Sequence, residues 1–292
     1  MLSKHEHDYA MEYRLRELDP ELHKRFTDSV FGLQKVLSNY KLIFPEYTDH
    51  TELHSLTVID FCNRLIGDQI ESLNADELYV LLMGCYFHDT GMGISEKDYE
   101  AFSKQIDFGD YFKTHAGEEP AETIRNFHNE YSGLFIRKYA PFFEIPSEAH
   151  LQAIVQISRG HRKTNLLDES AYPIRLPTPN GNGICLPYLS ALIRLADEID
   201  VTAARDSILL YDMEGLENAY SIEIHKRHQA VHELRISPAA FTLLVDTSDP
   251  EIDEVVCDMA RKMQKTLDDC RGAVNGRTPY VITQEHVRML SI

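Results

Sequence analysis

The sequence has no apolar run long enough to cross a membrane. Its longest apolar stretch, Leu78 to Phe87, is about half of the roughly 20 residues that a membrane-spanning helix needs. The N-terminus, MLSKHEHDYAMEYRLREL, also lacks the apolar core of a secretion signal. The five cysteines are scattered and form no CxxC pair, which argues against a disulfide framework and a thiolate zinc site. We therefore expect a soluble, cytoplasmic protein with reduced thiols.

Basic residues are few. The chain has 29 lysines and arginines against 47 aspartates and glutamates, a formal net charge of −18 at pH 7. Such a charge repels phosphate backbones and anionic lipids, so we expect neither a nucleic acid nor a membrane as partner. A small phosphorylated substrate, such as a nucleotide, remains compatible with it, because a bound metal ion dominates the charge at its own site.

Helical periodicity dominates the first 206 residues, which we expect to form one helical domain with its core at 45–205. Asp19-Pro20 is typical of a capped helix start, and a second helix begins near His54. Further helical patterns are ADELYVLLMGCYFHD, apolar nearly all round and therefore central, AETIRNFHNEYSGLFIRKYA, SEAHLQAIVQISRGH and LPYLSALIRLADEID. The irregular stretch 95–122 indicates a lid or an insertion, and 165–185 a long loop.

The pattern changes in residues 207–292, which we interpret as a small α+β appendage. The segments ILLYDM, AYSIEIHKRHQAVHELRI and AFTLLVDT alternate or carry β-favouring residues and predict short strands. We expect the basic tract HKRHQAVHELR to be an exposed face of that sheet. A helical pattern returns in DPEIDEVVCDMARKMQKTLDDCRGAV. The predicted fold class is therefore mainly α, a helical bundle with a C-terminal α+β appendage.

Six histidines and aspartates stand at or near the ends of apolar helical segments, or within one. Successive members from different segments are 33 to 39 residues apart, about the length of a helix and a connection, so each helix of one bundle can supply a ligand to a common metal site. The six predicted metal ligands are His54, His88, Asp89, His128, His161 and Asp197.

The residue types indicate the kind of metal. Imidazole and carboxylate without thiolate suit manganese, iron, nickel, cobalt or zinc. Six ligands exceed the needs of one four-coordinate ion, whereas two divalent transition metal ions sharing the Asp89 carboxylate use them all. Two such ions can clamp a phosphoryl group and generate hydroxide from water at neutral pH.

The ordered set resembles the HD superfamily of metal-dependent phosphohydrolases, which is named for an adjacent His-Asp pair like His88-Asp89. The family order of His, His-Asp and a distant Asp matches His54, His88-Asp89 and Asp197, and the two-metal branch adds histidines where His128 and His161 stand. The segments YTDHTELHS, CYFHDTGMG, ISRGHRK and IRLADEID also resemble family segments. The resemblance covers about 45–205, and the most similar subgroup is the HD domains that occur alone or joined to Hsp90-like ATPases.

Other residues near these motifs are candidates for binding or proton transfer. His50 precedes His54 by four residues, a spacing similar to that of cyclic-nucleotide phosphodiesterases, where the earlier histidine protonates the leaving oxygen; a capping histidine is the alternative. Arg162 and Lys163 follow His161 and are predicted to bind phosphate, unless they form an exposed surface pair.

Further polar residues flank the set. Arg194 and Arg205 bracket Asp197 and are placed to contact substrate or, for both, to pair with the carboxylates of residues 197–200. We interpret Asp200 as a neighbour of the ligands rather than a ligand. His115 and His150 are the alternatives to His128 and His161.

The resemblance implies a hydrolase that cleaves a phosphoester or phosphodiester of a nucleotide or cyclic nucleotide through a metal-bound hydroxide, with His50 and Asp89 as catalytic residues. Two alternatives have the same ligands. One is a mixed-valent diiron oxygenase of the HD fold, and the other is a non-catalytic HD sensor or interaction module. A homo-oligomer stays open.

Overall fold

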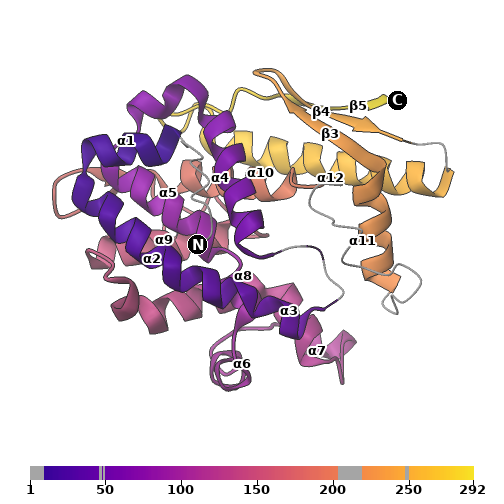
Figure 1. Cartoon of the computed structure of the whole chain (residues 1–292), viewed down its shortest axis with the longest axis horizontal. Helices are drawn as coiled ribbons and strands as arrows, with labels where there is room; N and C mark the ends of the chain where they lie inside the picture. Colours follow the sequence, from indigo (N-terminus) through magenta and orange to yellow (C-terminus); the bar gives the residue numbers. More distant parts are fainter. Residues whose placement is uncertain (1–9, 46–47, 49, 203–218, 247–249) are drawn as a thin grey trace, which may run out of the picture.

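The computed structural model describes residues 10–45, 48, 50–202, 219–246 and 250–292, and helices make up most of it (Figure 1). The fold class predicted from the sequence, mainly α with a C-terminal α+β part, is confirmed. Within the described residues, none of the helices is long and apolar enough to span a bilayer.

The elements follow one another along the chain with short connections. The α-helices are α1 (Ala10–Leu18), α2 (Pro20–Ser38), α3 (Tyr40–Ile43), α4 (Glu52–Ile66), α5 (Ala75–Phe87), α6 (Glu96–Ser103), α7 (Tyr111–Thr114), α8 (Pro120–Tyr139), α9 (Glu148–Gly160), α10 (Leu186–Glu198), α11 (Ala219–Ala230) and α12 (Pro250–Val274). The 3₁₀ helices are η1 (Gly67–Ser72), η2 (Thr90–Gly93) and η3 (Ala140–Phe143), and the strands are β1 (Leu176–Pro177), β2 (Gly183–Ile184), β3 (Val231–Ile236), β4 (Ala240–Val245) and β5 (His286–Ser291).

Helix α5 is the centre of the bundle. It is packed by α1, α2, α4, α9 and α10, and nearly every one of its residues is buried. This explains why its sequence is apolar on all sides rather than on one face. Asn74 and Glu77 form a capping box at its start, which satisfies backbone N–H groups that the helix leaves unpaired. The α-helix ends at Phe87, and η2 carries the chain on past the His-Asp pair.

Residues 219–230 form helix α11, so the strand predicted for that part of the chain is wrong. The buried residues Ile224, His225 and His228 have helical spacing, and Glu223 to Gln229 contains straight-chain polar residues that favour a helix. The apparent alternation arose because two of the inward-facing residues are histidines, which a hydrophobic pattern counts as polar. Only β3, from Val231 onward, follows the strand prediction, and β4 follows it at 240–245.

The C-terminal part packs directly on the bundle. Strands β3 and β4 are antiparallel, β5 joins β4 in parallel, and α12 packs along α10 and β5 (Figure 1). The core is continuous between the two parts, since Met263 and Leu267 of α12 belong to the same buried cluster as α5. The division expected after residue 206 falls outside the described residues and stays a prediction.

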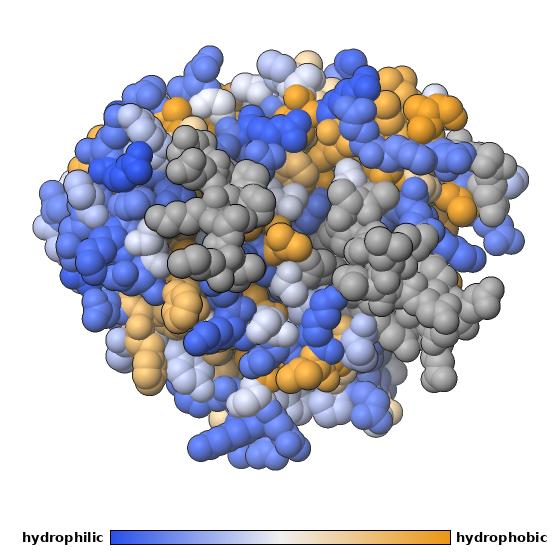
Figure 2. Space-filling view, in the orientation of Figure 1, coloured by the Kyte–Doolittle hydropathy of each residue, from blue (hydrophilic) through white to orange (hydrophobic). Residues whose placement is uncertain are grey.

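Two connections differ from a plain coil. The stretch 95–122 contains α6 and α7, and α6 packs on α8. The stretch 165–185 contains the short β1–β2 pair. On the surface, the view in Figure 2 is largely hydrophilic, and hydrophobic residues gather at its upper right, over the three-stranded sheet of Figure 1.

A buried aspartate ties three segments together. The carboxylate of Asp76, in the first turn of α5, accepts hydrogen bonds from His150 Nε2 (3.0 Å), Thr178 Oγ1 (2.7 Å), Asn180 Nδ2 (3.2 Å) and Asn182 Nδ2 (3.2 Å). Burial acts to raise the pKa of Asp76, but the bonds from His150 and Thr178 outweigh it and lower the pKa to about 2. The ionised carboxylate therefore stabilises the contact of α5 with α9 and the β1–β2 connection.

We predict that Asp76→Ala lowers the free energy of unfolding by about 2 kcal/mol or more at pH 7, since a pKa unit corresponds to about 1.4 kcal/mol. Because the folded pKa is below the unfolded value of 3.8, the contribution is present above about pH 4 and is lost as the pH falls toward 2. Urea unfolding at neutral and acid pH measures it. The exposed Asp28→Ala is the control, and equal unfolding curves for the two variants would contradict the prediction.

Candidate metal centre

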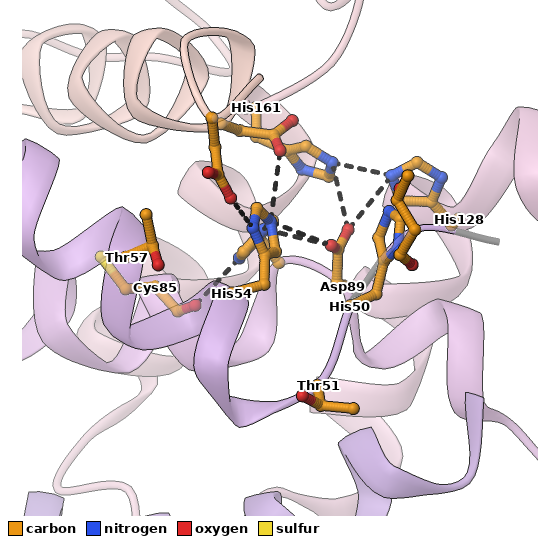
Figure 3. A network of polar contacts seen from close by, with 12 residues as sticks. His50, Thr51, His54, Thr57, Cys85, Asp89, His128 and His161 are labelled. Atoms are coloured by element: carbon orange, nitrogen blue, oxygen red, sulfur yellow. Dashed lines mark hydrogen bonds and ion pairs between the residues drawn. The ribbon is translucent and has the colours of Figure 1, made fainter. Parts of the chain in front are cut away.

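The six predicted ligands meet at one place, although they come from five different helices. His54 lies in the first turn of α4, His88 and Asp89 directly follow α5, His128 lies within α8, His161 directly follows α9, and Asp197 lies in the last turn of α10 (Figure 3). All are buried except Asp197, whose side chain is 22% exposed.

The turn after α5 is held close to α8. Ser132 of α8 donates from Oγ to the carbonyl of His88 (2.6 Å) and accepts from the N–H of Gly91 (2.8 Å). A Cβ at Gly91 would collide with the main chain of His128 and lie 2.7 Å from the nitrogen of Ser132. Helix α8 is kinked at Phe127, where φ is −122° and ψ is 16°, immediately before His128. The glycine and the kink together set the separation of the two ligand-bearing segments.

Each of the four imidazoles uses Nδ1 for a hydrogen bond to the surrounding protein. The acceptors are the Asp200 carboxylate for His54 (2.7 Å), and the main-chain carbonyls of Cys85 for His88 (2.9 Å), Arg125 for His128 (2.8 Å) and Ser158 for His161. Three of the four acceptors are therefore carbonyls three residues earlier in the same helix. With the proton on Nδ1, each neutral ring has its lone pair on Nε2, as a metal-ligating histidine requires.

The Nε2 atoms face one another in two pairs. Those of His54 and His88 are 3.2 Å apart, and those of His128 and His161 are 2.8 Å apart. Two nitrogen lone pairs at this distance repel each other unless a proton or a cation lies between or beside them. The arrangement fits a metal ion at each pair.

Asp89 lies between the pairs and faces both. Its Oδ2 is 3.3 Å from Nε2 of His88 and 3.5 Å from Nε2 of His54, and its Oδ1 is 3.3 Å from Nε2 of His128 and 3.7 Å from Nε2 of His161 (Figure 3). Oδ2 is buried and accepts no hydrogen bond from the described residues. A buried carboxylate oxygen is costly without a partner, so this atom also fits a metal ligand. Two ligand groups result, and they share Asp89.

Asp197 and Asp200 flank the first pair on the α10 side. Asp197 Oδ1 is 3.3 Å from Nε2 of His54 and also lines a cavity, so it borders the centre on the solvent side. Asp200 is buried and bonds only the far nitrogen, Nδ1, of the same imidazole among these atoms. The interpretation of Asp200 as a neighbour of the ligands agrees with this geometry.

The carboxylates keep a proton at His88. Burial acts to lower the pKa of His88, but Asp89 and Asp197 outweigh it and raise the pKa to about 9. Burial would raise the pKa values of Asp89 and Asp197, yet the imidazoles, His88 first for Asp89 and His54 first for Asp197, hold both well below their usual range. Both carboxylates are therefore ionised at neutral pH.

The second pair is neutral at physiological pH. Burial, followed by the nearby positive charge of Arg162, lowers the pKa of His128 to about 4. Burial, followed by the other two imidazoles, holds the pKa of His161 well below its usual range. Both Nε2 lone pairs are consequently available to a cation without loss of a proton.

A cavity of about 690 Å³ adjoins the centre, and Asp89, His128, His161 and Asp197 form part of its wall. This is a suitable size for a small ligand. His50, Arg162 and Lys163 line the same cavity, as their predicted roles require. His50 lies just before α4, with its ring 5.6 Å from that of His54, and its Nδ1 donates to the carbonyl of Thr48 (2.7 Å).

The alternative histidines lie elsewhere. His150 bonds Asp76 at the far end of α5, and His115 is exposed and stacked on Tyr111. Arg194 does line the cavity, but it donates to the carbonyls of Gly160 and Thr164 (both 2.8 Å), so its predicted pairing with carboxylates is wrong. Arg205, predicted to bind substrate, lies outside the described residues.

The sequence-based set missed the part of the cavity wall that the C-terminal helices supply. Arg227 and His228 of α11 and Lys262 and Lys265 of α12 line the cavity. The tract HKRHQAVHELR was therefore wrongly assigned to an exposed sheet face, because its first half is helical and partly buried. The basic residues spaced by three in RKMQK were the signal that a helical reading would have placed on one face.

The site has the arrangement of an HD-type domain, with an adjacent His-Asp pair at its centre. The protein-family model HD-CE matches residues 44–279, most of the chain, and the protein belongs to this family. The match continues through α11 and α12, well beyond the part in which the sequence resemblance was visible. The search of curated proteins and that of solved structures each found no significant match.

We predict that Asp200→Ala lowers the affinity for divalent metal about 10- to 100-fold, because it removes the acceptor that fixes the His54 ring. Competition with a chromogenic chelator measures the affinity. Asp60→Ala, on the same helix as His54 and half exposed, is the control. Unchanged affinity in Asp200→Ala would show that the imidazole needs no such support.

Proposed function

We propose that the protein is a metal-dependent phosphohydrolase that cleaves a phosphoester or phosphodiester of a nucleotide or cyclic nucleotide. The observation that carries the proposal is the pair of ligand groups that share Asp89, each with two inward-facing Nε2 atoms. A carboxylate between two such groups is suited to two divalent ions, and paired ions are typical of enzymes that cleave phosphate esters.

The residues divide between the two ions as the distances suggest. His54, His88 and Asp197 would hold one, His128 and His161 the other, and Asp89 both. The nitrogen and oxygen donors suit manganese, iron, nickel, cobalt or zinc. When bound, such ions supply Lewis-acid polarisation of the phosphoryl group and activation of water.

The chain's own residues bind and orient the substrate. Arg162 and Lys163 follow the ligand His161 and line the cavity, where they would bind the phosphoryl oxygens. His50 donates from Nδ1 to Thr48, which leaves its Nε2 to carry the proton that the leaving oxygen takes up. The basic cavity also favours an anionic substrate over the neutral one that an oxygenase could take.

We predict that Asp89→Asn abolishes turnover, with a loss of more than about a hundredfold, because the amide replaces the one group that faces both ligand pairs. Metal content by mass spectrometry, circular dichroism and a screen of nucleotides, cyclic dinucleotides and generic phosphodiesters with manganese measure it. Asp60→Asn is the control.

The same panel separates the alternative functions. A metal-loaded wild-type protein that hydrolyses nothing in the panel would overturn the proposal. A mixed-valent iron signal in electron paramagnetic resonance would then favour an oxygenase. Loss of fold in Asp89→Asn, with no turnover in the wild type, would instead favour a non-catalytic module.

We predict that His50→Gln lowers kcat about 100-fold or more for an alkyl phosphoester, a typical value for loss of a general acid. The loss should be small for p-nitrophenyl phosphodiesters, because that leaving group departs without a proton. Turnover of the two substrate types by wild type and variant measures this. An equal loss for both would assign His50 to binding rather than to proton transfer.

A further inference from the structure

The cavity next to the metal centre has a charge opposite to that of the chain. Acidic residues outnumber basic ones 47 to 29 in the whole sequence, yet the cavity wall has seven lysines and arginines and five carboxylates. Three of those carboxylates, Asp89, Asp197 and Asp200, belong to the metal centre. Beyond the centre the wall is therefore cationic, and a cleft of one sign concentrates ligands of the other.

Helix α12 supplies one part of this cationic wall. Its lining residues are spaced by three and four and so lie on one face: Met259, Lys262, Lys265, Thr266 and Asp269. Lys262 pairs with Glu198 (2.9 Å), the residue after Asp197, so this face meets α10 where α10 carries its metal ligand. Lys265 is about 4.5 Å farther along the helix axis.

Helix α11 supplies another part. Ile224, Arg227 and His228 line the cavity and have the spacing of one helix face. Arg227 is half-buried, and its Nε is fully buried with no hydrogen-bond partner among the described residues. A buried guanidinium nitrogen without an acceptor is costly, and its cost is removed when an anion enters.

Four of the cavity's cations have no partner. Within the part of the chain that the structure describes, Arg162, Lys163, Arg227 and Lys265 make no ion pair or side-chain hydrogen bond. By contrast, Lys138 and Arg159 elsewhere on the molecule pair with Asp98 and Glu130. In a chain with an excess of carboxylates, unpaired cations gathered around one cavity indicate that their counterion is the ligand.

We propose that Arg227 and Lys265 bind a phosphate group beyond the one that is cleaved, so that the substrate carries linked phosphates, as nucleoside diphosphates and triphosphates do. This inference rests on the proposed function, in which Arg162 and Lys163 bind the phosphoryl group at the metal centre. It assigns substrate selection to the C-terminal helices. A simple monoester occupies the metal centre alone and gains nothing from α11 and α12.

Binding of two non-hydrolysable probes tests the proposal. Methylenediphosphonate carries two linked phosphonates and methylphosphonate one, and calorimetry measures their affinities for the metal-loaded, full-length protein. Arg227→Gln and Lys265→Gln should each weaken the diphosphonate about tenfold, the value of one charge-assisted hydrogen bond, and leave methylphosphonate unchanged. Lys265 is exposed, so its variant removes the charge without disturbing the core.

Two matched variants serve as controls. Lys226→Gln removes a charge next to Arg227, and Arg261→Gln removes one from α12; neither residue lines the cavity. Both should bind the diphosphonate as the wild type does. Wild-type affinity in Arg227→Gln and Lys265→Gln, or an equal loss in all four variants, would overturn the inference.

Turnover separates the inference from the proposed function. For a nucleoside triphosphate, Arg227→Gln and Lys265→Gln should raise KM and leave kcat nearly unchanged. If no phosphoester is hydrolysed but the two variants still lose diphosphonate affinity, the binding inference stands and the hydrolase proposal fails. If monoesters are hydrolysed and the variants bind the diphosphonate normally, the hydrolase proposal stands and the inference fails.

Discussion

The position of one carboxylate, that of Asp89, determines how the rest of the centre is built. It faces two pairs of imidazole nitrogens at 3.3 to 3.7 Å, and those nitrogens come from four helices. The bundle must therefore bring four helix segments within a few ångströms of one side chain. The fully buried α5, the close approach at Gly91 and the kink before His128 all meet this requirement.

Much of the centre could be predicted from the sequence because its ligands follow apolar helical segments at regular intervals. His54, His88, Asp89, His128, His161 and Asp197 were identified in this way, and the structure brings all six together. The conformation that aims them was not predictable. Three imidazoles are anchored by main-chain carbonyls, and a carbonyl is present whatever the residue, so it leaves no signal in a sequence.

The C-terminal part shows where pattern reading fails. Residues 219–230 alternate in polarity only because His225 and His228 are buried, and burial of a histidine depends on tertiary neighbours that the sequence does not reveal. The cavity face of α12 was missed for a related reason. Its lysines look like an ordinary exposed face until Lys262 is seen against Glu198, at the end of a helix 52 residues earlier.

The carbonyl anchors have a consequence for how such a centre changes in evolution. Because Cys85, Arg125 and Ser158 contribute only main-chain oxygens, substitutions at these three positions leave the acceptors in place as long as the helix ends keep their shape. The ring orientations are thus inherited with the backbone. Side-chain drift there is free to alter the surroundings, whereas the imidazole that relies on Asp200 has no such tolerance.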